Sequence, residues 1–443
     1  MREGGAKTIA ISSAVLLTEN LIRLIAVVLV SFWMARQLGP GQFGILNFAS
    51  AFMAILLAVA AMGLDTPVIL RLTHASRPGA LLGTALLIRG IASLVVFALG
   101  LLIALLLKQG DHLSLQATWI VSLCILAYTF NTLDFWFKAH TASAAPALAR
   151  TAASLLGIGA KVAFLLMGLG VVALAWTITL EAVLAGIGLV LAYLWSTKNS
   201  PQDKLSLDPS EIRPLLKESL PYLWSSVAVL LYMKVDVVML GYLSSKQETG
   251  IYSLAQKLSE VLYMVPVVLI DSAYPTLARK FLAAQSDQAS HGQMLFDLAV
   301  GGSLVAVALA MLLVGPAITL VFGSEYTASI DIFRLHAWSC VAIALNTARH
   351  RWLATVGLQR HAPTVTLIGL VLNLAMNVVL IPAMGAMGAA IATVVSYFVS
   401  GYFTSYLIPP LREIGQMQTR SLWPWSRLFQ AALHWHSQSR SLP

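Results

Sequence analysis

Long apolar runs recur along almost the whole chain and constrain its fold more than any other feature. They fall at residues 8–34, 43–70, 80–107, 115–137, 147–167, 171–196, 216–243, 250–277, 296–322, 330–354, 361–382 and 385–408. A helix needs about 20 apolar residues to cross a bilayer, and these runs reach that length. We therefore expect an all-α polytopic membrane protein with about twelve transmembrane helices.

The composition supports this expectation and excludes other classes of protein. Hydrophobic residues make up 58% of the chain and charged residues only 11%, whereas soluble domains carry about 25% charged residues. The net charge of +9 does not indicate nucleic-acid binding, because the basic residues are not gathered on one polar domain. Both cysteines, Cys124 and Cys340, lie inside apolar runs, so no disulfide framework is expected.

Lysines and arginines favour one side of the membrane. If the N-terminus is cytoplasmic, nineteen of the 28 fall in inside segments, three in outside loops and six within spans. Cytoplasmic loops carry an excess of these residues in membrane proteins. Both termini are therefore expected to be cytoplasmic, and Arg349 and Arg351 are counted among the inside residues.

The polar stretch TKNSPQDKLSLDPSEIRPLLK divides the runs into six plus six. The predicted parts are a six-helix bundle at 1–196, a cytoplasmic linker at 197–217, a second six-helix bundle at 218–408 and a cytoplasmic tail at 409–443. Within the linker, Asp208 and Pro209 are typical of a helix start, and we expect a short interfacial helix there. The tail carries tryptophans among arginines, which favours a segment on the membrane surface; a disordered tail is the alternative.

The two halves share an internal repeat. Asp65 corresponds to Asp271, and Met167-Gly168 corresponds to Met384-Gly385. Similar matches join Gly44-Ile45 with Gly250-Ile251 and Ala145-Pro146 with Ala362-Pro363. Apolar helices also align by chance, but matches in several loops favour a true repeat. Two bundles of six spans keep the same orientation, so a pseudo-two-fold axis along the membrane normal would relate them.

Ionisable residues interrupt the two apolar runs between residues 220 and 279. They are Lys234, Asp236, Lys257, Glu260 and Asp271. An ionisable group at bilayer depth costs at least about 2.5–3.5 kcal/mol, so such groups usually face a bundle interior or a wet cavity. This helical hairpin is therefore expected to line a pathway.

Three segments carry a resemblance to a known family. The phrase MARQLGPGQFGILNFASAFMAIL, residues 34–56, resembles the first outside turn of bacterial oligosaccharide flippases. The phrase KVDVVMLGYLSSKQETGIYSLAQKL, residues 234–258, is similar to their seventh-to-eighth helix junction, and GAMGAA at 385–390 to the start of their last span. These flippases, of the O-antigen or exopolysaccharide (Wzx) type, form the polysaccharide-transport branch of the multidrug/oligosaccharidyl-lipid/polysaccharide superfamily.

The resemblance implies two six-helix bundles, often V-shaped, around a central cationic cavity that opens to one side at a time. It implies that the chain flips an oligosaccharide linked to undecaprenyl diphosphate across the bacterial inner membrane, while the polyprenyl tail stays in lipid. It further implies a monomer that is not an enzyme and that needs no cofactor and no metal.

A diphosphate headgroup needs cations at the depth of the cavity. The candidate substrate-binding cations are Arg23, Lys161, Lys234 and Lys257. For Lys161 and Lys257 the alternative is that each side chain extends to the outer membrane interface.

Acidic residues within the spans are candidates for coupling to H+ or Na+ or for structural pairing. They are Glu19, Glu181, Asp236 and Glu260. Glu19 and Arg23 are four residues apart, so they share a helix face and can pair. Lys257 and Glu260 are three apart and can do the same, whereas Glu181 has no partner nearby in sequence. Asp65 and Asp271 lie at the inner ends of their spans and are candidates for a cytoplasmic gate.

Aromatic residues near the span ends are expected to anchor the helices at the membrane interface. They are Trp33, Trp136, Trp195 and Trp352.

Two other functions compete with flipping. The chain holds no Gly-x4-Gly-Lys-Ser/Thr loop, so it is not expected to hydrolyse ATP. A multidrug or cation antiporter of the same superfamily would favour acids in the cavity, whereas six basic residues lie within these spans. A membrane polysaccharide polymerase or ligase would need a large outside loop, and all outside loops here are short.

Overall fold

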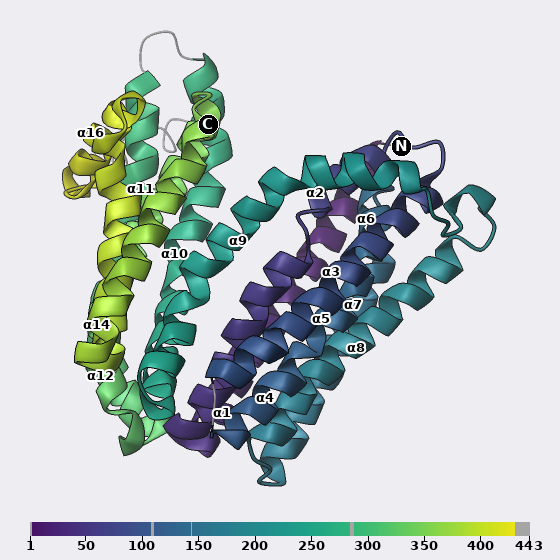
Figure 1. The fold of residues 1–443 in the computed structure, drawn as a ribbon. Helices are drawn as coiled ribbons and strands as arrows, with labels where there is room; N and C mark the ends of the chain where they lie inside the picture. Colours follow the sequence, from purple (N-terminus) through teal and green to yellow (C-terminus); the bar gives the residue numbers. More distant parts are fainter. Residues whose placement is uncertain (1, 108–109, 143, 284–287, 430–443) are drawn as a thin grey trace. The chain divides into compact units, whose positions relative to one another are not determined.

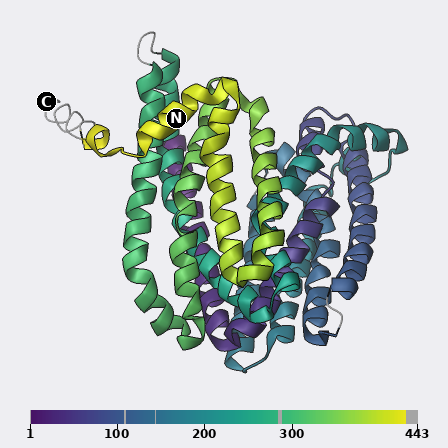
Figure 2. The ribbon, with the colours of Figure 1, turned by 60° about the vertical axis from the view of Figure 1, so that its left-hand side comes forward.

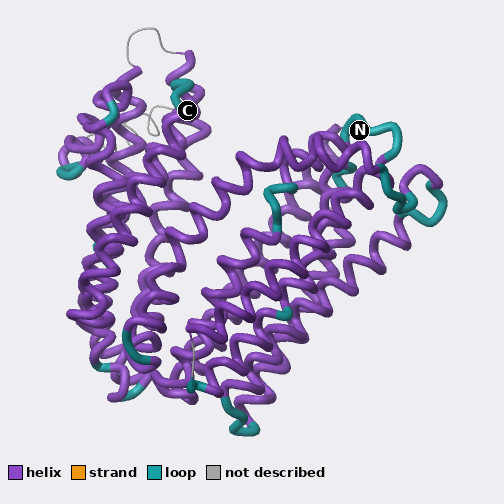
Figure 3. Tube along the Cα trace, in the orientation of Figure 1, coloured by secondary structure: helices purple, strands orange, loops and turns teal. Residues whose placement is uncertain are grey.

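The computed structural model describes residues 2–107, 110–142, 144–283 and 288–429, with the side chains of 2–27, 107, 280, 282–283, 288–289 and 291 left aside. Within this part of the chain every regular element is helical (Figure 3). The chain divides into two compact units, Met1–Val227 and Ala228–Pro443, so the division falls inside the helix α9 (Ile212–Leu243). The predicted boundaries at residues 196, 217 and 408 stay a prediction.

Unit 1 is a bundle of long helices joined by short turns (Figure 1). Its helices are α1 (Arg2–Ala60), α2 (Asp65–Leu72), α3 (Pro78–Leu107), α4 (His112–Ser122), α5 (Cys124–Ala127), α6 (Asp134–Ala139), α7 (Ala144–Leu166), α8 (Val171–Ser196) and the first part of α9, with 3-10 turns η1 (Tyr128–Leu133), η2 (Pro201–Asp203) and η3 (Pro209–Glu211).

Unit 2 is built in the same way from the rest of α9 and the helices that follow it. They are α10 (Lys246–Ala283), α11 (Gln288–Phe322), α12 (Ala328–His336), α13 (Ser339–Thr355), α14 (Ala362–Phe398), α15 (Thr404–Leu407) and α16 (Arg412–Ser421), with short turns η4 (Ser324–Tyr326), η5 (Gln359–His361) and η7 (Pro409–Leu411) and a π-helical turn η6 (Val399–Phe403).

The described residues contain ten helical stretches long and apolar enough to cross a membrane. Two of them are broken by glycines in the left-handed region, Gly39 (φ 67°) in α1 and Gly385 (φ 57°) in α14. α1 is 59 residues long, roughly 90 Å at 1.5 Å per residue, which is far more than one bilayer crossing. Each break divides a long helix into two segments, so α1 and α14 account for four of the about twelve spans that the sequence predicts, and the chain is an all-α multi-pass membrane protein.

The internal repeat is visible in backbone geometry. Gly168 (φ 67°) joins α7 to α8, and its repeat partner Gly385 (φ 57°) breaks α14 at the corresponding place in unit 2. Glycine adopts positive φ without the steric cost that a Cβ brings. The helices that precede these two glycines also begin within one residue of matching positions, at Ala144 and Ala362, since the repeat pairs Ala145 with Ala362.

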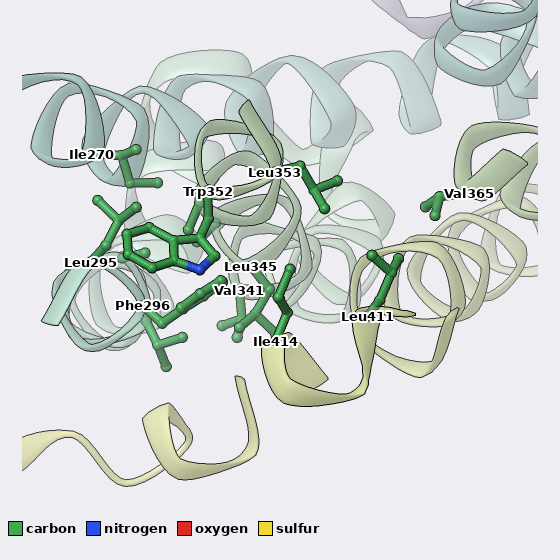
Figure 4. Packing of buried hydrophobic residues seen from close by; sticks show 14 residues of the cluster. Ile270, Leu295, Phe296, Val341, Leu345, Trp352, Leu353, Val365, Leu411 and Ile414 are labelled. Carbon is green, nitrogen blue, oxygen red and sulfur yellow. The ribbon is translucent and has the colours of Figure 1, made fainter. Parts of the chain in front are cut away.

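Each unit has its own apolar core. In unit 1 one cluster joins α2, α3, α6 and α8 around Leu82, Phe135 and Tyr193. In unit 2 a cluster around Phe296 and Trp352 joins α10, α11, α13 and α14 (Figure 4). Large apolar side chains on the opposite helix faces are exposed, which is the pattern of helices that face lipid.

The linker is fixed to the rest of unit 1 by residues 203–208, which we call the linker strap; the strap starts at the last residue of η2 and is extended at Lys204 and Asp208. It crosses the start of α3, where Ser206 N donates to Gly79 O at 3.3 Å and Asp208 N donates to Thr84 Oγ1 at 2.9 Å. A Cβ at Gly79 or Gly83 would lie 2.1 Å from a strap carbonyl oxygen. The close approach of the strap to α3 therefore requires glycine at both positions.

The predicted helix start in the linker is confirmed, although it does not make a separate helix. Asp208 accepts from Ser210 N with Pro209 in the first turn, and η3 leads directly into α9. These hydrogen bonds from Ser210 lower the pKa of Asp208 below its ordinary value.

The described part of the predicted tail packs onto unit 2. Leu411 and Ile414 belong to the core of that unit, and α16 lies at one end of its helices (Figure 2). Asp297 of α11 is buried and accepts from Arg427 Nε at 2.6 Å and Nη2 at 2.9 Å. This ion pair ties Arg427, which lies beyond the end of α16, to α11. Residues 430–443 of the predicted tail lie outside the described residues.

Candidate functional site

Lys234 and Asp236 point to different surroundings, as their spacing of two residues predicts. Lys234 Nζ donates to Glu260 Oε1 at 3.2 Å, and the side chains keep 29% and 37% of their exposure. This ion pair joins α9 to α10. Glu260 therefore has a partner on the neighbouring helix in addition to the intrahelical candidate Lys257.

Asp236 lies at the centre of a buried polar cluster in unit 2. It is 1% exposed. Its carboxylate accepts from Asn377 Nδ2 at 2.6 Å, Thr393 Oγ1 at 2.5 Å and Tyr252 OH at 3.1 Å. Asn377 Nδ2 also donates to Asn373 Oδ1 at 3.1 Å. The carboxylate of α9 thus sits among neutral groups contributed by α10 and both halves of α14.

One acceptor in this cluster is left without a partner. Asn377 Oδ1 is buried and makes no hydrogen bond. Burying a carboxylate costs several kcal/mol unless a proton or a cation compensates for it. An acidic oxygen beside amide and hydroxyl oxygens is the donor set that a hard monovalent cation takes, and it equally suits a protonated carboxyl group. Groups of three or more His, Cys, Asp or Glu side chains suited to a transition metal are not found among the described residues.

Lys161 and Glu181 form an ion pair in unit 1. Lys161 Nζ lies 2.7 Å from Glu181 Oε2, and the pair joins α7 to α8. Glu181 had no partner nearby in sequence because the two residues lie 20 positions apart on different helices. Gly157 makes room for the acid, since an added Cβ would lie 2.8 Å from Glu181 Oε2.

The two gate candidates are each held by an arginine of their own unit. Arg89 Nη1 lies 3.7 Å from Asp65 Oδ1, and the guanidinium stacks over the Phe135 ring at 5.9 Å. Arg351 contacts Asp271 Oδ1 through Nε at 3.0 Å and Nη2 at 2.8 Å. The repeat thus keeps the acid at corresponding places, but the arginine comes from the third span in one unit and the fourth in the other.

The remaining candidate residues are Lys257 on α10 and Glu19 and Arg23 on α1. Lys257 is partly buried on α10 and engaged in an interaction of its own. Glu19 and Arg23 lie on α1 outside the residues whose side chains are described.

Sequence reasoning placed Arg349 among the inside segments and missed its burial. Arg349 is 1% exposed, inside α13 of unit 2. It also missed the amides of the Asp236 cluster, although Asn373 and Asn377 stand four residues apart in an apolar run, which is the available signal.

Two of the predicted interface tryptophans are core residues instead. Trp136 and Trp352 are buried, at 8% and 3% exposure. Trp136 Nε1 donates to Asp203 Oδ1 of the linker strap at 2.9 Å, and Trp352 packs against Phe281. Trp195 is 79% exposed, as an interface anchor requires.

Solved structures share this fold. An inward-facing multidrug resistance MATE family transporter of the MOP superfamily aligns with a TM-score of 0.67 and 14% identity, over 90% of this chain and 96% of that one. The lipid II flippase MurJ in an inward closed conformation aligns with a TM-score of 0.66 and 14% identity, over 91% of each chain. At this identity the likeness concerns the fold alone.

Two curated relatives come from Haloferax volcanii. The probable low-salt glycan biosynthesis flippase Agl15 is 24% identical over 380 residues, which is 83% of this chain and 76% of the relative. The probable flippase AglR is 22% identical over 404 residues, or 88% of this chain and 81% of the relative.

Two family models match the chain. The MatE model matches residues 221–379. The model described as polysaccharide biosynthesis protein matches residues 7–281, which is more than half of the chain. The chain therefore belongs to the polysaccharide biosynthesis protein family.

Proposed function

We propose that this protein is a flippase that moves a lipid-linked oligosaccharide across a membrane by alternating access. The carrier lipid of this oligosaccharide is undecaprenyl diphosphate, and the membrane is the bacterial inner membrane. The transported glycan serves O-antigen or exopolysaccharide synthesis. The observation that carries the proposal is the similarity of most of the chain to two probable flippases, one of them named for glycan biosynthesis.

The substrate contacts in this proposal are cations within the spans. Lys234 is the first candidate, because its side chain keeps access while Glu260 holds it in place. Arg23, Lys161 and Lys257 are the others. Asp65 and Asp271, each beside an arginine, would form a gate at the cytoplasmic ends of their spans. In this orientation both termini lie in the cytoplasm. The excess of lysines and arginines in the predicted inside segments supports it.

The Asp236 cluster supplies a site for the coupling ion. A proton or Na+ taken up by Asp236 would neutralise the buried carboxylate, and Asn377 Oδ1 offers an unused acceptor for a cation. Release of the ion would leave a buried charge, which favours a different packing of α9 against α14. This gives the ion a differential affinity for two conformations, which coupling requires.

The second candidate is a cation or drug antiporter. The MatE match over residues 221–379 and the shared fold favour it. One reconstitution distinguishes the two functions. Proteoliposomes of the purified protein are given a fluorescent undecaprenyl-diphosphate oligosaccharide and, in a parallel sample, a cationic dye. Movement of the lipid between leaflets without dye transport supports flipping, and the reverse result supports the antiporter.

A further inference from the structure

Arg349 of unit 2 is a buried cation whose hydrogen bonds are almost complete. Its Nη1 donates to Thr404 Oγ1 at 3.0 Å and to Ser405 Oγ at 3.1 Å. Its Nη2 donates to Asn346 Oδ1 at 2.6 Å and to the Ser400 carbonyl oxygen at 2.7 Å. A guanidinium carries five N–H groups. The fifth donor, Nε, is buried without a partner.

The neighbours of Arg349 hold its guanidinium in place by hydrogen bonds but do not neutralise its positive charge. All four acceptors are neutral: two hydroxyls, an amide and a carbonyl. Other arginines in the described part of the chain have an acidic counter-ion. Arg150 forms a bidentate ion pair with Asp134, and Arg351 pairs with Asp271. A buried charge without a counter-ion is costly, so an anion at this place would be stabilised.

A cavity of about 280 Å³ lies next to groups that hold Arg349, although Arg349 itself is not part of its lining. α9, α13 and α14 with η6 line it, and its polar lining residues are Tyr232, Asn346, His350, Thr366, Tyr397 and Ser400. Two of the groups that Arg349 contacts, Asn346 and Ser400, are in this lining. The lining includes no acidic side chain, so it combines a nearby positive charge with neutral hydrogen-bonding groups.

We propose that the Arg349 cavity binds a phosphate-bearing headgroup. The uncompensated charge of Arg349 attracts a phosphate through space, and the hydroxyl and amide groups of the lining can donate hydrogen bonds to the phosphate oxygens. The volume equals roughly nine water molecules at about 30 Å³ each and lies just below the usual range of about 300–1,000 Å³ for ligand pockets. A space of this size suits one phosphate-bearing headgroup. The phosphate can come from the lipid-linked glycan, in which case the inference rests on the proposed function, or from a membrane phospholipid.

Thiol labelling tests the charge of the cavity directly. Thr366 lines the cavity, whereas Thr364 is exposed on the same helix outside it. Both native cysteines are fully buried, so they give little background. In Thr366→Cys, the negatively charged sulfonatoethyl methanethiosulfonate is expected to react about tenfold faster than a trimethylammonium analogue, relative to the same ratio in Thr364→Cys. In Thr366→Cys combined with Arg349→Gln, the ratio should fall to that of the control.

Ligand protection keeps the test valid if Arg349→Gln does not fold. Thr366→Cys in dodecyl maltoside micelles, which contain no phosphate, is labelled with and without a hexose phosphate or inorganic phosphate, and again in phosphatidylglycerol nanodiscs. Protection by the hexose phosphate supports the site and assigns it to a sugar-linked phosphate. Protection only in phosphatidylglycerol supports the site and assigns it to membrane lipid, and protection by inorganic phosphate alone supports a phosphate site that needs no further group.

Equal charge ratios at positions 364 and 366 would overturn the proposal, as would labelling that no phosphate slows. Flipping is measured separately on the unmodified protein. If the protein flips the lipid but no phosphate protects the thiol of Thr366→Cys from labelling, the cavity site is rejected and the proposed function is kept. If phosphate protects the thiol but no lipid is flipped, the cavity site is kept and the proposed function is rejected.

Discussion

Lys234 and Glu260 form an ion pair across α9 and α10, with Nζ 3.2 Å from Oε1. The pair lies two residues from the buried Asp236 on α9. One short segment therefore carries both a partly exposed cation, suited to a passing anion, and a buried acid, suited to a coupling ion.

A charge swap separates a substrate role of Lys234 from a structural one. Lys234→Ala should lower the initial flipping rate about tenfold, close to the loss of one charge-assisted hydrogen bond of about 1.5 kcal/mol. Glu260→Gln should change the rate little, because Lys234 remains. The double variant Lys234→Glu with Glu260→Lys restores an ion pair with the cation moved to α10. Recovery of the full rate in this variant would show that only the pair matters.

Asp236→Asn should abolish the dependence of flipping on an ion gradient. The amide keeps the size of the side chain, but it takes up no proton and has no negative charge to bind a cation. Tyr252→Phe is the control, because it removes one donor to Asp236 and leaves the carboxylate in place. The rate is measured with imposed H+ and Na+ gradients. An ion response that survives in Asp236→Asn would place coupling elsewhere.

Gly83→Ala should destabilise unit 1, although alanine normally favours a helix. Its Cβ would lie 2.1 Å from Ser206 O of the linker strap, and such overpacking costs about 1–3 kcal/mol. Gly90→Ala on the same helix is the matched control, because its nearest contact would be Thr129 Cγ2 at 3.8 Å. The midpoint of thermal unfolding in detergent should fall only in the first variant. Equal midpoints would mean that the strap does not rest on α3.

Lys161 and Glu181 should show energetic coupling in a double-variant cycle. Lys161→Met leaves Glu181 without its counter-charge, and Glu181→Gln leaves Lys161 in the same position. The double variant should be more stable than the two single effects predict, by about 1 kcal/mol. Additive effects on unfolding would contradict the ion pair that joins α7 to α8.

The sequence was sufficient to predict the spans and the repeat, because apolar length and glycine position act locally. Runs of apolar residues mark each span, and the matched glycines Gly168 and Gly385 both adopt positive φ. Which charged residues form ion pairs was harder to predict from the sequence. Spacing along a helix offers only intrahelical candidates, such as Lys257 for Glu260, whereas Glu260 pairs with Lys234 on α9 and Glu181 pairs with Lys161 on α7.

Burial was equally hard to infer for groups near span ends. Arg349 was assigned to an inside segment by topology, whereas packing of α13 against η6 and α15 encloses it. Trp136 was taken for an interface anchor, but the linker strap covers it and accepts its indole N–H. Both depend on contacts between segments far apart in the sequence, which periodicity does not report.

The most direct test of the central claim is the rate at which a fluorescent undecaprenyl-diphosphate oligosaccharide changes leaflets in proteoliposomes. The lipid is incorporated in both leaflets, and a membrane-impermeant quencher reads the outer fraction over time. For a flippase we expect movement that depends on the protein, saturates with the lipid-linked glycan and slows in Lys234→Ala. Movement no faster than in protein-free vesicles, together with export of a cationic dye by the same preparation, would contradict it.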